Sequence, residues 1–220
     1  MKKLLLLLSC FLAFGLSVDG QKPMTHEIMI KLKKVGAPKI SPDGRHVIYS
    51  RIETSYNLDE QSSDLWIAST DGTSEPRKIT NSKGSEDNYQ WSAASDKIYF
   101  IAKRDGDEAP QLYVLPLSGG EAQRLTTLST GVSDVKFSSD GSRIIFSSRV
   151  FPTAFTDSAS KKIAEEKKKI KTKARVYQSF PVRYWDSWLD EKQGHIFTMD
   201  LKSGSKPVNL MSNVTLVNSP

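Results

Sequence analysis

One pattern of hydrophobic and polar positions occurs three times along the chain, at residues 40–49, 91–100 and 137–146. Each copy has an apolar residue, a serine, a short polar turn and then three residues that favour β-strands. Asp-Gly at the turn of the first and third copies supplies the left-handed conformation that a tight turn needs. The Val, Ile, Tyr and Phe that follow suit a strand buried on both faces. The repeat therefore predicts three β-hairpins, and the middle one, which lacks Asp-Gly, is expected to have a turn of another type.

A second predicted hairpin follows each of the first two copies. Turns at Asp71-Gly72 and Gly119-Gly120 join an apolar strand to a strand of basic, apolar and Thr residues. Four strands in a unit of about 40 to 50 residues are typical of the blades of a β-propeller. We therefore predict an all-β fold, an incomplete β-propeller over 37–220 with about three four-stranded blades. The strands of the second hairpin are expected at 65–68 and 77–80, and again at 112–115 and 123–126.

The third unit is interrupted by an insertion at 151–194. Its last two strands are predicted at 195–200 and 209–211, and residues from Asn213 are expected to begin a fourth blade. Within the insertion, Asp157 to about Tyr177 is expected to form a helix, with lysines around a narrow apolar seam. The predicted seam consists of Ala159, Ile163, Ile170 and Ala174, and the aromatic cluster expected after the helix consists of Phe180, Tyr184, Trp185 and Trp188.

The first 20 residues have the pattern of a secretory signal peptide. Two lysines precede an apolar run from Leu4 to Leu16, and small residues precede a cleavage site after Gly20. This run is too short to span about 30 Å of hydrocarbon. We therefore expect an exported, periplasmic protein with no integral membrane span after cleavage. The alternative is a lipoprotein anchored through Cys10, the single cysteine of the chain.

Residues 21–36 are predicted to form a short helix and a lead-in to the first blade. Thr25 is the expected N-cap of a helix that reaches Lys34, and Glu27 suits its first turn. Met24 is placed to pack on Met29.

The net charge of +6 comes from one stretch of the chain. Residues 161–175 hold eight basic and two acidic side chains, so the rest of the chain is neutral. A lysine-rich helix without interleaved aromatic residues is more typical of a solvated face than of a phosphate-binding surface. No nucleic-acid partner is therefore expected.

No catalytic, cofactor or metal site is predicted within these residues. The sequence has no Gly-x-Ser-x-Gly nucleophile elbow and no phosphate-binding or dinucleotide-binding glycine motif. His46 is expected on an exposed turn and His195 at the start of a strand, so neither is assigned to a metal. The acidic stretch 105–108 lacks the spacing of a calcium loop and is predicted to be a plain turn.

Two segments carry a family resemblance. The first is Ser41-Pro42-Asp43-Gly44 followed by Val47-Ile48-Tyr49, and the second is the aromatic segment 180–188 followed by His195-Ile196-Phe197. The first motif also resembles the propeller protein of the Tol-Pal system. In combination, the two segments resemble the dipeptidyl-peptidase V and acylaminoacyl-peptidase branch of the prolyl oligopeptidase family. The resemblance covers nearly all of the chain after the predicted signal peptide.

The resemblance implies the propeller of a serine exopeptidase that releases short N-terminal units from peptides. It also implies a C-terminal α/β-hydrolase domain with a Ser-Asp-His triad, which we expect beyond Pro220, and a homodimer is one expected assembly of the full-length protein. One alternative is a non-enzymatic periplasmic propeller of the Tol-system type that binds a partner protein. Another is a carbohydrate-binding or scaffold propeller with exposed aromatic residues.

A substrate-facing patch is predicted in the insertion. A desolvated ammonium group needs a paired charge, so acidic side chains suit the free amino end of a peptide. Asp186, Asp190 and Glu191, flanked by Trp185 and Trp188, are the predicted patch. The alternative is that the aromatic residues pack the insertion onto the propeller while the acids face water.

Overall fold

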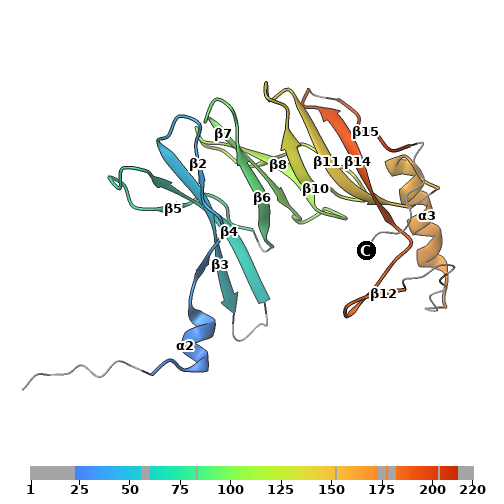
Figure 1. Ribbon diagram of the computed structural model, residues 1–220, viewed down its shortest axis with the longest axis horizontal. Helices are drawn as coiled ribbons and strands as arrows, with labels where there is room; N and C mark the ends of the chain where they lie inside the picture. Colours follow the sequence, from blue (N-terminus) through green and yellow to red (C-terminus); the bar gives the residue numbers. More distant parts are fainter. Residues whose placement is uncertain are drawn as a thin grey trace, which may run out of the picture.

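In its described residues, the computed structural model contains three larger antiparallel sheets that follow one another in an arc (Figure 1), and a fourth, two-stranded sheet. The predicted signal peptide with Cys10, the start of the fourth blade, Ala174 and Phe180 lie outside the described residues. The structure describes residues 23–55, 60–82, 84–151, 153–172, 177, 182–202 and 204–212.

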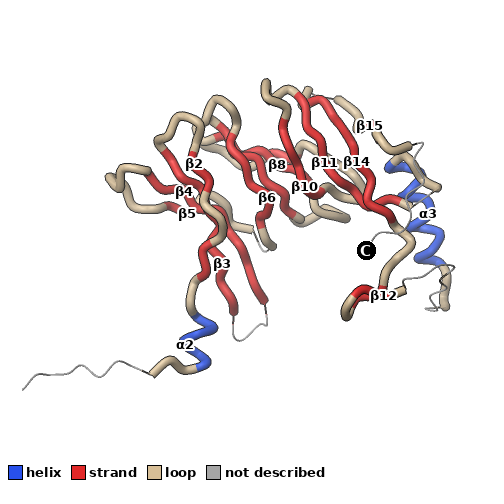
Figure 2. The backbone as a smooth tube through the Cα atoms, viewed as in Figure 1, coloured by secondary structure: helices blue, strands red, loops and turns tan. Residues whose placement is uncertain are grey.

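Each of the three larger sheets is one blade, and the helices lie near the two ends of the arc (Figure 2). In blades 2 and 3 the four strands pair in chain order, as predicted. Blade 1 comprises β1 (Lys34–Val35), β2 (Lys39–Ile40), β3 (His46–Ser55), β4 (Glu60–Ser69) and β5 (Arg77–Lys78). Blade 2 comprises β6 (Glu86–Trp91), β7 (Lys97–Ala102), β8 (Gln111–Pro116) and β9 (Gln123–Arg124). Blade 3 comprises β10 (Ser133–Phe137), β11 (Arg143–Val150), β14 (Gln193–Asp200) and β15 (Val208–Asn209).

The first strand of blade 1 is split in two. Both β1 and β2 pair with β3 on the edge opposite β4. The two short strands together therefore take the place that one strand has in the other blades. The first strands of the other blades are irregular at the same place. Their registers shift after Asp87 and after Ser133, and the next residues, Asn88 and Asp134, have φ of 49° and 50°. All three first strands are therefore bent at one equivalent position.

The expectation of a different turn in the middle copy is wrong. Ser95 has a φ of 60° and occupies the position of Gly44 and Gly141, whose φ values are 74° and 68°. In all three turns the backbone amide at this position donates a hydrogen bond of 2.8 to 3.0 Å to the carbonyl of the serine that the repeat places three residues earlier. Ser95 also accepts a hydrogen bond from the Asp43 amide of blade 1 at 3.1 Å. This contact between blades stabilises a conformation that usually favours glycine.

The Thr of the basic-apolar-Thr strand continues the sheet ladder with its side chain. The Leu65 amide donates to Thr80 Oγ1 at 2.8 Å, and the Leu112 amide donates to Thr126 Oγ1 at 2.9 Å. β5 and β9 are only two residues long, so each hydroxyl supplies a hydrogen bond that the backbone of the outer strand does not. These threonines are buried, where an unpaired backbone amide is costly.

Two hydrophobic cores lie between neighbouring blades. Alternate residues of one strand serve different cores, which explains why the repeat has apolar residues in succession. Complete burial of each large side chain contributes roughly 1.5–3 kcal/mol. The core between blades 1 and 2 includes Ile48, Leu65, Ile67, Tyr89, Ile98, Phe100 and Tyr113. The core between blades 2 and 3 includes Ile101, Leu112, Val135, Ile144, Phe146, Phe197 and Met199.

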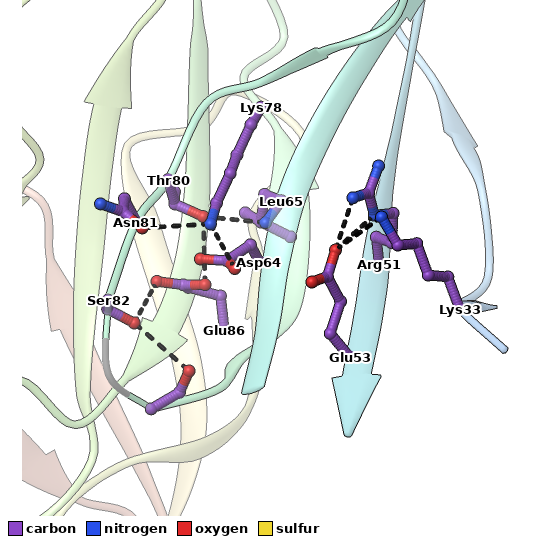
Figure 3. A network of polar contacts seen from close by, with 11 residues as sticks. Lys33, Arg51, Glu53, Asp64, Leu65, Lys78, Thr80, Asn81, Ser82 and Glu86 are labelled. Atoms are coloured by element: carbon purple, nitrogen blue, oxygen red, sulfur yellow. Dashed lines mark hydrogen bonds and ion pairs between the residues drawn. The ribbon is translucent and has the colours of Figure 1, made fainter. Parts of the chain in front are cut away.

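A buried polar network also joins blades 1 and 2 (Figure 3). The side chain of Glu86 is completely buried, and it accepts hydrogen bonds from Ser82 Oγ at 2.6 Å and Thr80 Oγ1 at 3.0 Å. Lys78 forms an ion pair of 2.7 Å with the buried Asp64. Burial raises the pKa of Glu86, and the hydrogen bonds from Ser82 and Thr80 lower it only in part. The negative charge of Asp64 raises it further, and the positive charge of Arg104 lowers it.

The N-terminal helix is shorter than predicted. α2 spans His26–Lys31, and Thr25 caps it as expected by accepting from the Ile28 amide at 3.3 Å. The expectation that it reaches Lys34 is wrong because Leu32 is already extended, and Lys34 pairs with Ile52 at the start of β1.

The helix of the insertion is also shorter than predicted. α3 spans Asp157–Lys169 and ends at Ile170, so the expected extension to Tyr177 is wrong. Three consecutive lysines occupy its last turn, where positive charge is favoured by the helix dipole. Ile170 is 62% exposed and takes no part in the predicted seam. Ser160 is the buried contact instead, and its hydroxyl accepts from the Phe151 amide at 3.2 Å. None of the helices among the described residues is long and apolar enough to cross a membrane.

Candidate functional site

The insertion emerges where the second and third strands of blade 3 are joined. It contains α3 and a two-stranded hairpin, β12 (Arg183–Tyr184) and β13 (Ser187–Trp188). The hairpin and α2 both project from the lower side of the arc in Figure 1. Because antiparallel blades place all connections between second and third strands at one end, the insertion lies at the same end of the propeller as the β7–β8 turn.

A pocket of about 470 Å³ lies between the end of α3 and the segment that follows β13. Aromatic residues and charged residues of both signs surround it, which makes it suited to a ligand with an apolar body and a charged end. Its lining includes Phe151, Lys167, Tyr177, Trp188, Asp190 and Glu191.

Both acidic residues of the pocket already have cationic partners. Asp190 Oδ1 accepts from Arg149 Nη2 at 2.7 Å, and Glu191 Oε1 is 2.5 Å from Lys167 Nζ. All four side chains are substantially exposed, so each ion pair contributes only about 0–1 kcal/mol. Pairs this weak can be exchanged for another cation at little cost.

The structure divides the predicted patch into two groups. Trp188, Asp190 and Glu191 line the pocket, whereas Trp185 and Asp186 do not. Trp185 lies at the hairpin turn with a φ of 52° and is 85% exposed. Asp186 Oδ1 accepts from the hydroxyl of Ser187 at 3.1 Å.

The described aromatic residues of the insertion do not form one packed cluster. Tyr184, Trp185 and Trp188 are all more than half exposed. Trp188 contacts Tyr177 with ring centroids 6.2 Å apart, and the guanidinium of Arg183 lies 5.6 Å from the Trp188 ring. The hairpin therefore presents aromatic surface outward.

The sequence did not reveal the cationic partners of the two pocket acids, of which Lys167 lines the pocket and Arg149 does not. Arg149 and Asp190 are 41 positions apart, and Lys167 and Glu191 are 24 apart. The lysine-rich stretch was visible in the sequence, but its apolar seam gave no sign that Lys167 turns toward the segment after the hairpin. Tyr177 was expected at the end of a helix and instead lines the pocket.

His46 and His195 do not lie where the sequence predicted them. His46 is the first residue of β3 and not part of the turn, and it is half-buried beside Trp91. His195 is 1% exposed inside β14, where it shares a hydrogen bond of 3.0 Å with Asn209 and packs against Phe155. It therefore does not begin the strand, because β14 starts at Gln193.

The acidic stretch 105–108 is a turn between β7 and β8, as predicted. Asp107 accepts hydrogen bonds from the Tyr113 hydroxyl at 2.6 Å and from Arg124 at 2.6 Å. Its carboxylate is therefore fully engaged in the blade. In the described parts of the chain, His, Cys, Asp and Glu side chains nowhere gather in threes that could hold a metal ion.

The chain matches a family model over residues 24–180, and that model is described as the TolB beta propeller domain (PD40). The match covers well over half of the chain. The chain belongs to the TolB β-propeller family. The family match and the blade pairing together confirm the predicted propeller.

Curated relatives of this TolB-type propeller include peptidases. It is 32% identical over 126 residues to the uncharacterized peptidase YuxL of Bacillus subtilis, a match that covers 57% of this chain and 19% of the relative. It is 22% identical over 183 residues to dipeptidyl-peptidase 5 of Porphyromonas endodontalis, which covers 81% of this chain and 24% of that protein. The chain thus spans about a fifth to a quarter of the length of these relatives, and the predicted resemblance to peptidases is confirmed.

Solved structures show the same fold at low identity. The Pyrococcus horikoshii acylaminoacyl peptidase superposes with a TM-score of 0.56 at 11% identity, over 81% of this chain and 25% of that one. The AtxE2 isopeptidase superposes with a TM-score of 0.57 at 17% identity, over 90% of this chain and 34% of that one. These likenesses establish the propeller architecture.

Proposed function

We propose that this propeller is the substrate-gating part of an exported serine exopeptidase that releases short N-terminal units from peptides. Its relatives are peptidases several times longer than the chain, which supports a catalytic domain in the full-length protein. The observation that carries the proposal is the pocket beside α3, where Trp188 lies close to two carboxylates with exchangeable partners. A peptide ammonium can replace Lys167 at Glu191 while its first side chain packs on the aromatic wall.

Labelling of the full-length protein with a fluorophosphonate probe tests the serine-peptidase assignment. We expect one labelled serine and hydrolysis of a dipeptidyl substrate with a free amino end, but much slower hydrolysis of its acetylated form. Absence of both labelling and hydrolysis would refute the proposal and favour a non-enzymatic propeller.

Substitution of the pocket acids tests the role of the insertion. We expect Asp190→Ala combined with Glu191→Ala to lower kcat/KM for the free-amino substrate by up to about thirtyfold, since each of the two lost ion pairs costs at most about 1 kcal/mol. Asp186→Ala is the matched control, because this acid belongs to the same insertion but does not line the pocket. An unchanged kcat/KM in the double variant would remove the acids from substrate binding.

The Lys167→Met variant distinguishes two roles of the pocket by the sign of its effect. If Glu191 binds the substrate ammonium, loss of the competing Lys167 lowers KM by up to about fivefold, the equivalent of one exposed ion pair. A raised KM would instead mean that Lys167 itself contacts the peptide.

Export is part of the same proposal and rests on the signal-peptide pattern of residues 1–20. N-terminal sequencing of the mature protein tests it, and we expect the first residue to be Gln21. A mature protein that keeps Met1 would contradict export by cleavage.

A further inference from the structure

The first strands of neighbouring blades contact one another through side chains of β6. Trp91 Nε1 of β6 donates to the Lys39 carbonyl of β2 at 2.8 Å. Gln90 Nε2 of β6 donates to the Val135 carbonyl of β10 at 2.5 Å. These contacts bring equivalent positions of β2, β6 and β10 next to one another.

One equivalent position is Lys39 in blade 1, Gln90 in blade 2 and Lys136 in blade 3. Each directly precedes the apolar residue that begins the repeat, and each pairs with the equivalent residue of the second strand in its own blade. The bends of the first strands come immediately before this position, at the break between β1 and β2 and at Asn88 and Asp134. Bulges of this kind redirect side chains and are frequent next to functional sites.

The two lysines bring positive charge to the same inner strands. The Lys39 ammonium lies over the ring of Tyr89, 5.6 Å from its centroid. Burial lowers the pKa of Lys39, and the positive charge of Lys136 lowers it further. Neither lysine forms an ion pair within the described ranges.

The nearby acid Asp134 is not within ion-pair distance of either lysine in the described part of the chain. Asp134 accepts a hydrogen bond from the Ser147 hydroxyl of β11 at 2.9 Å. Gln90 uses its side-chain amide to donate to Asn88 and to the Val135 carbonyl. Two ammonium groups that share one region repel each other. An anion that binds between them offsets this repulsion.

We propose that Lys39 and Lys136 form a carboxylate-binding site on the inner wall of the propeller, and that its ligand is the C-terminal carboxylate of a short peptide. The peptide assignment rests on the proposed function. The pocket of the insertion has acidic residues for a peptide amino end, and the inner wall has the opposite charge. A short peptide carries both charges, whereas an internal segment of a long chain carries neither.

Equilibrium binding to the full-length protein tests the site without any dependence on hydrolysis. The probes are N-acetyl-D-Ala-D-Ala and its C-terminal amide, and their binding is measured by calorimetry. These probes are chosen because the acetyl group removes the amino charge and the D-residues resist cleavage. We expect the carboxylate to bind about tenfold more tightly than the amide, as two exposed ion pairs would give. The Lys39→Gln and Lys136→Gln double variant should lose this preference.

Two further variants separate charge loss from misfolding. Lys202→Gln with Lys206→Gln makes the same change in net charge at exposed positions on the β14–β15 connection, and it should keep the preference. Lys39→Arg with Lys136→Arg should keep it too. Equal binding of the carboxylate and the amide by the wild type, or a preference that survives in the double Gln variant, would overturn the proposal.

A last comparison identifies the ligand and separates the site from the proposed function. Inorganic phosphate that displaces the probe at a lower concentration than acetate would overturn the assignment to a carboxylate. Intact carboxylate preference in a protein that cleaves no peptide would refute the peptidase proposal alone. Cleavage with equal kcat/KM for free and amidated L-peptides, together with equal binding of the two probes, would refute the site alone.

Discussion

Replacement of Glu86 tests the buried polar network between blades 1 and 2 (Figure 3). Both carboxyl oxygens accept hydroxyl groups, from Ser82 at 2.6 Å and Thr80 at 3.0 Å, and the side chain is completely buried. Glu86→Ala leaves these hydroxyls without their partner. A buried polar group that loses its partner costs about 1–3 kcal/mol, and Ser82 is only half-buried. We therefore expect a loss of about 2–4 kcal/mol in the free energy of unfolding.

Glu86→Gln gives a sharper test because its effect depends on pH. The raised pKa of Glu86 means that the folded protein holds the proton more tightly than the unfolded protein does. The stability contributed by the protonated side chain is therefore complete below the unfolded pKa, near 4.5, and is lost as pH rises through the folded pKa. Gln cannot ionise, so the advantage of the wild type over Glu86→Gln should shrink as pH rises above 4.5.

Urea unfolding followed by tryptophan fluorescence between pH 4 and pH 8 measures this difference in the full-length protein. Glu53→Gln is the control with the opposite sign. A hydrogen bond from Arg51, aided by its charge and that of Lys33, lowers the pKa of Glu53, so the advantage of the wild type over this variant should shrink as pH falls through the pKa. A pH-independent difference for Glu86→Gln would refute the reasoning about burial.

Two predictions concern the contacts that set the blade turns and outer strands. Ser95→Ala should lower the free energy of unfolding by about 1–2 kcal/mol, because the left-handed conformation remains while the bond to the Asp43 amide is lost. Ser95→Gly should cost less, since glycine relieves that conformation, and equal losses in urea unfolding would contradict this account. Thr126→Val should cost about 1–3 kcal/mol and speed hydrogen exchange at the Leu112 amide, which loses its acceptor. Thr126→Ser keeps the hydroxyl and should protect that amide, so fast exchange in both variants would argue against the Thr contact.

The blade architecture could be predicted from the sequence because it depends on local patterns. Turn residues and alternating apolar residues specify each hairpin, and the repeat shows how many times the hairpins occur. Element ends were less accurate. α2 and α3 end early because Leu32 and Ile170 adopt extended backbone, and that change is set by the strand or segment that follows rather than by helix propensity.

The polar contacts between distant segments could not be predicted. Glu86 lies in a stretch of polar residues and gives no sequence signal of burial, yet residues from blade 1 and the connection after it surround it. In the candidate site, the acids and Trp188 were found from their grouping in the sequence. Their partners Arg149 and Lys167 were not, because pairing across an insertion depends on how the chain returns to blade 3.

Positions where the three copies of the repeat agree form the blade, whereas positions where they differ indicate contacts between blades or binding. Shared apolar, serine and turn residues explain the blade itself. Ser95 departs from the glycine of the other copies and makes a contact between blades. Lys39 and Lys136 flank Gln90 at one equivalent position, where uncharged residues would satisfy the strand equally well. Local departures from an otherwise consistent pattern are expected at functional or interfacial positions, so these departures and the insertion are where substitutions should change binding more than folding.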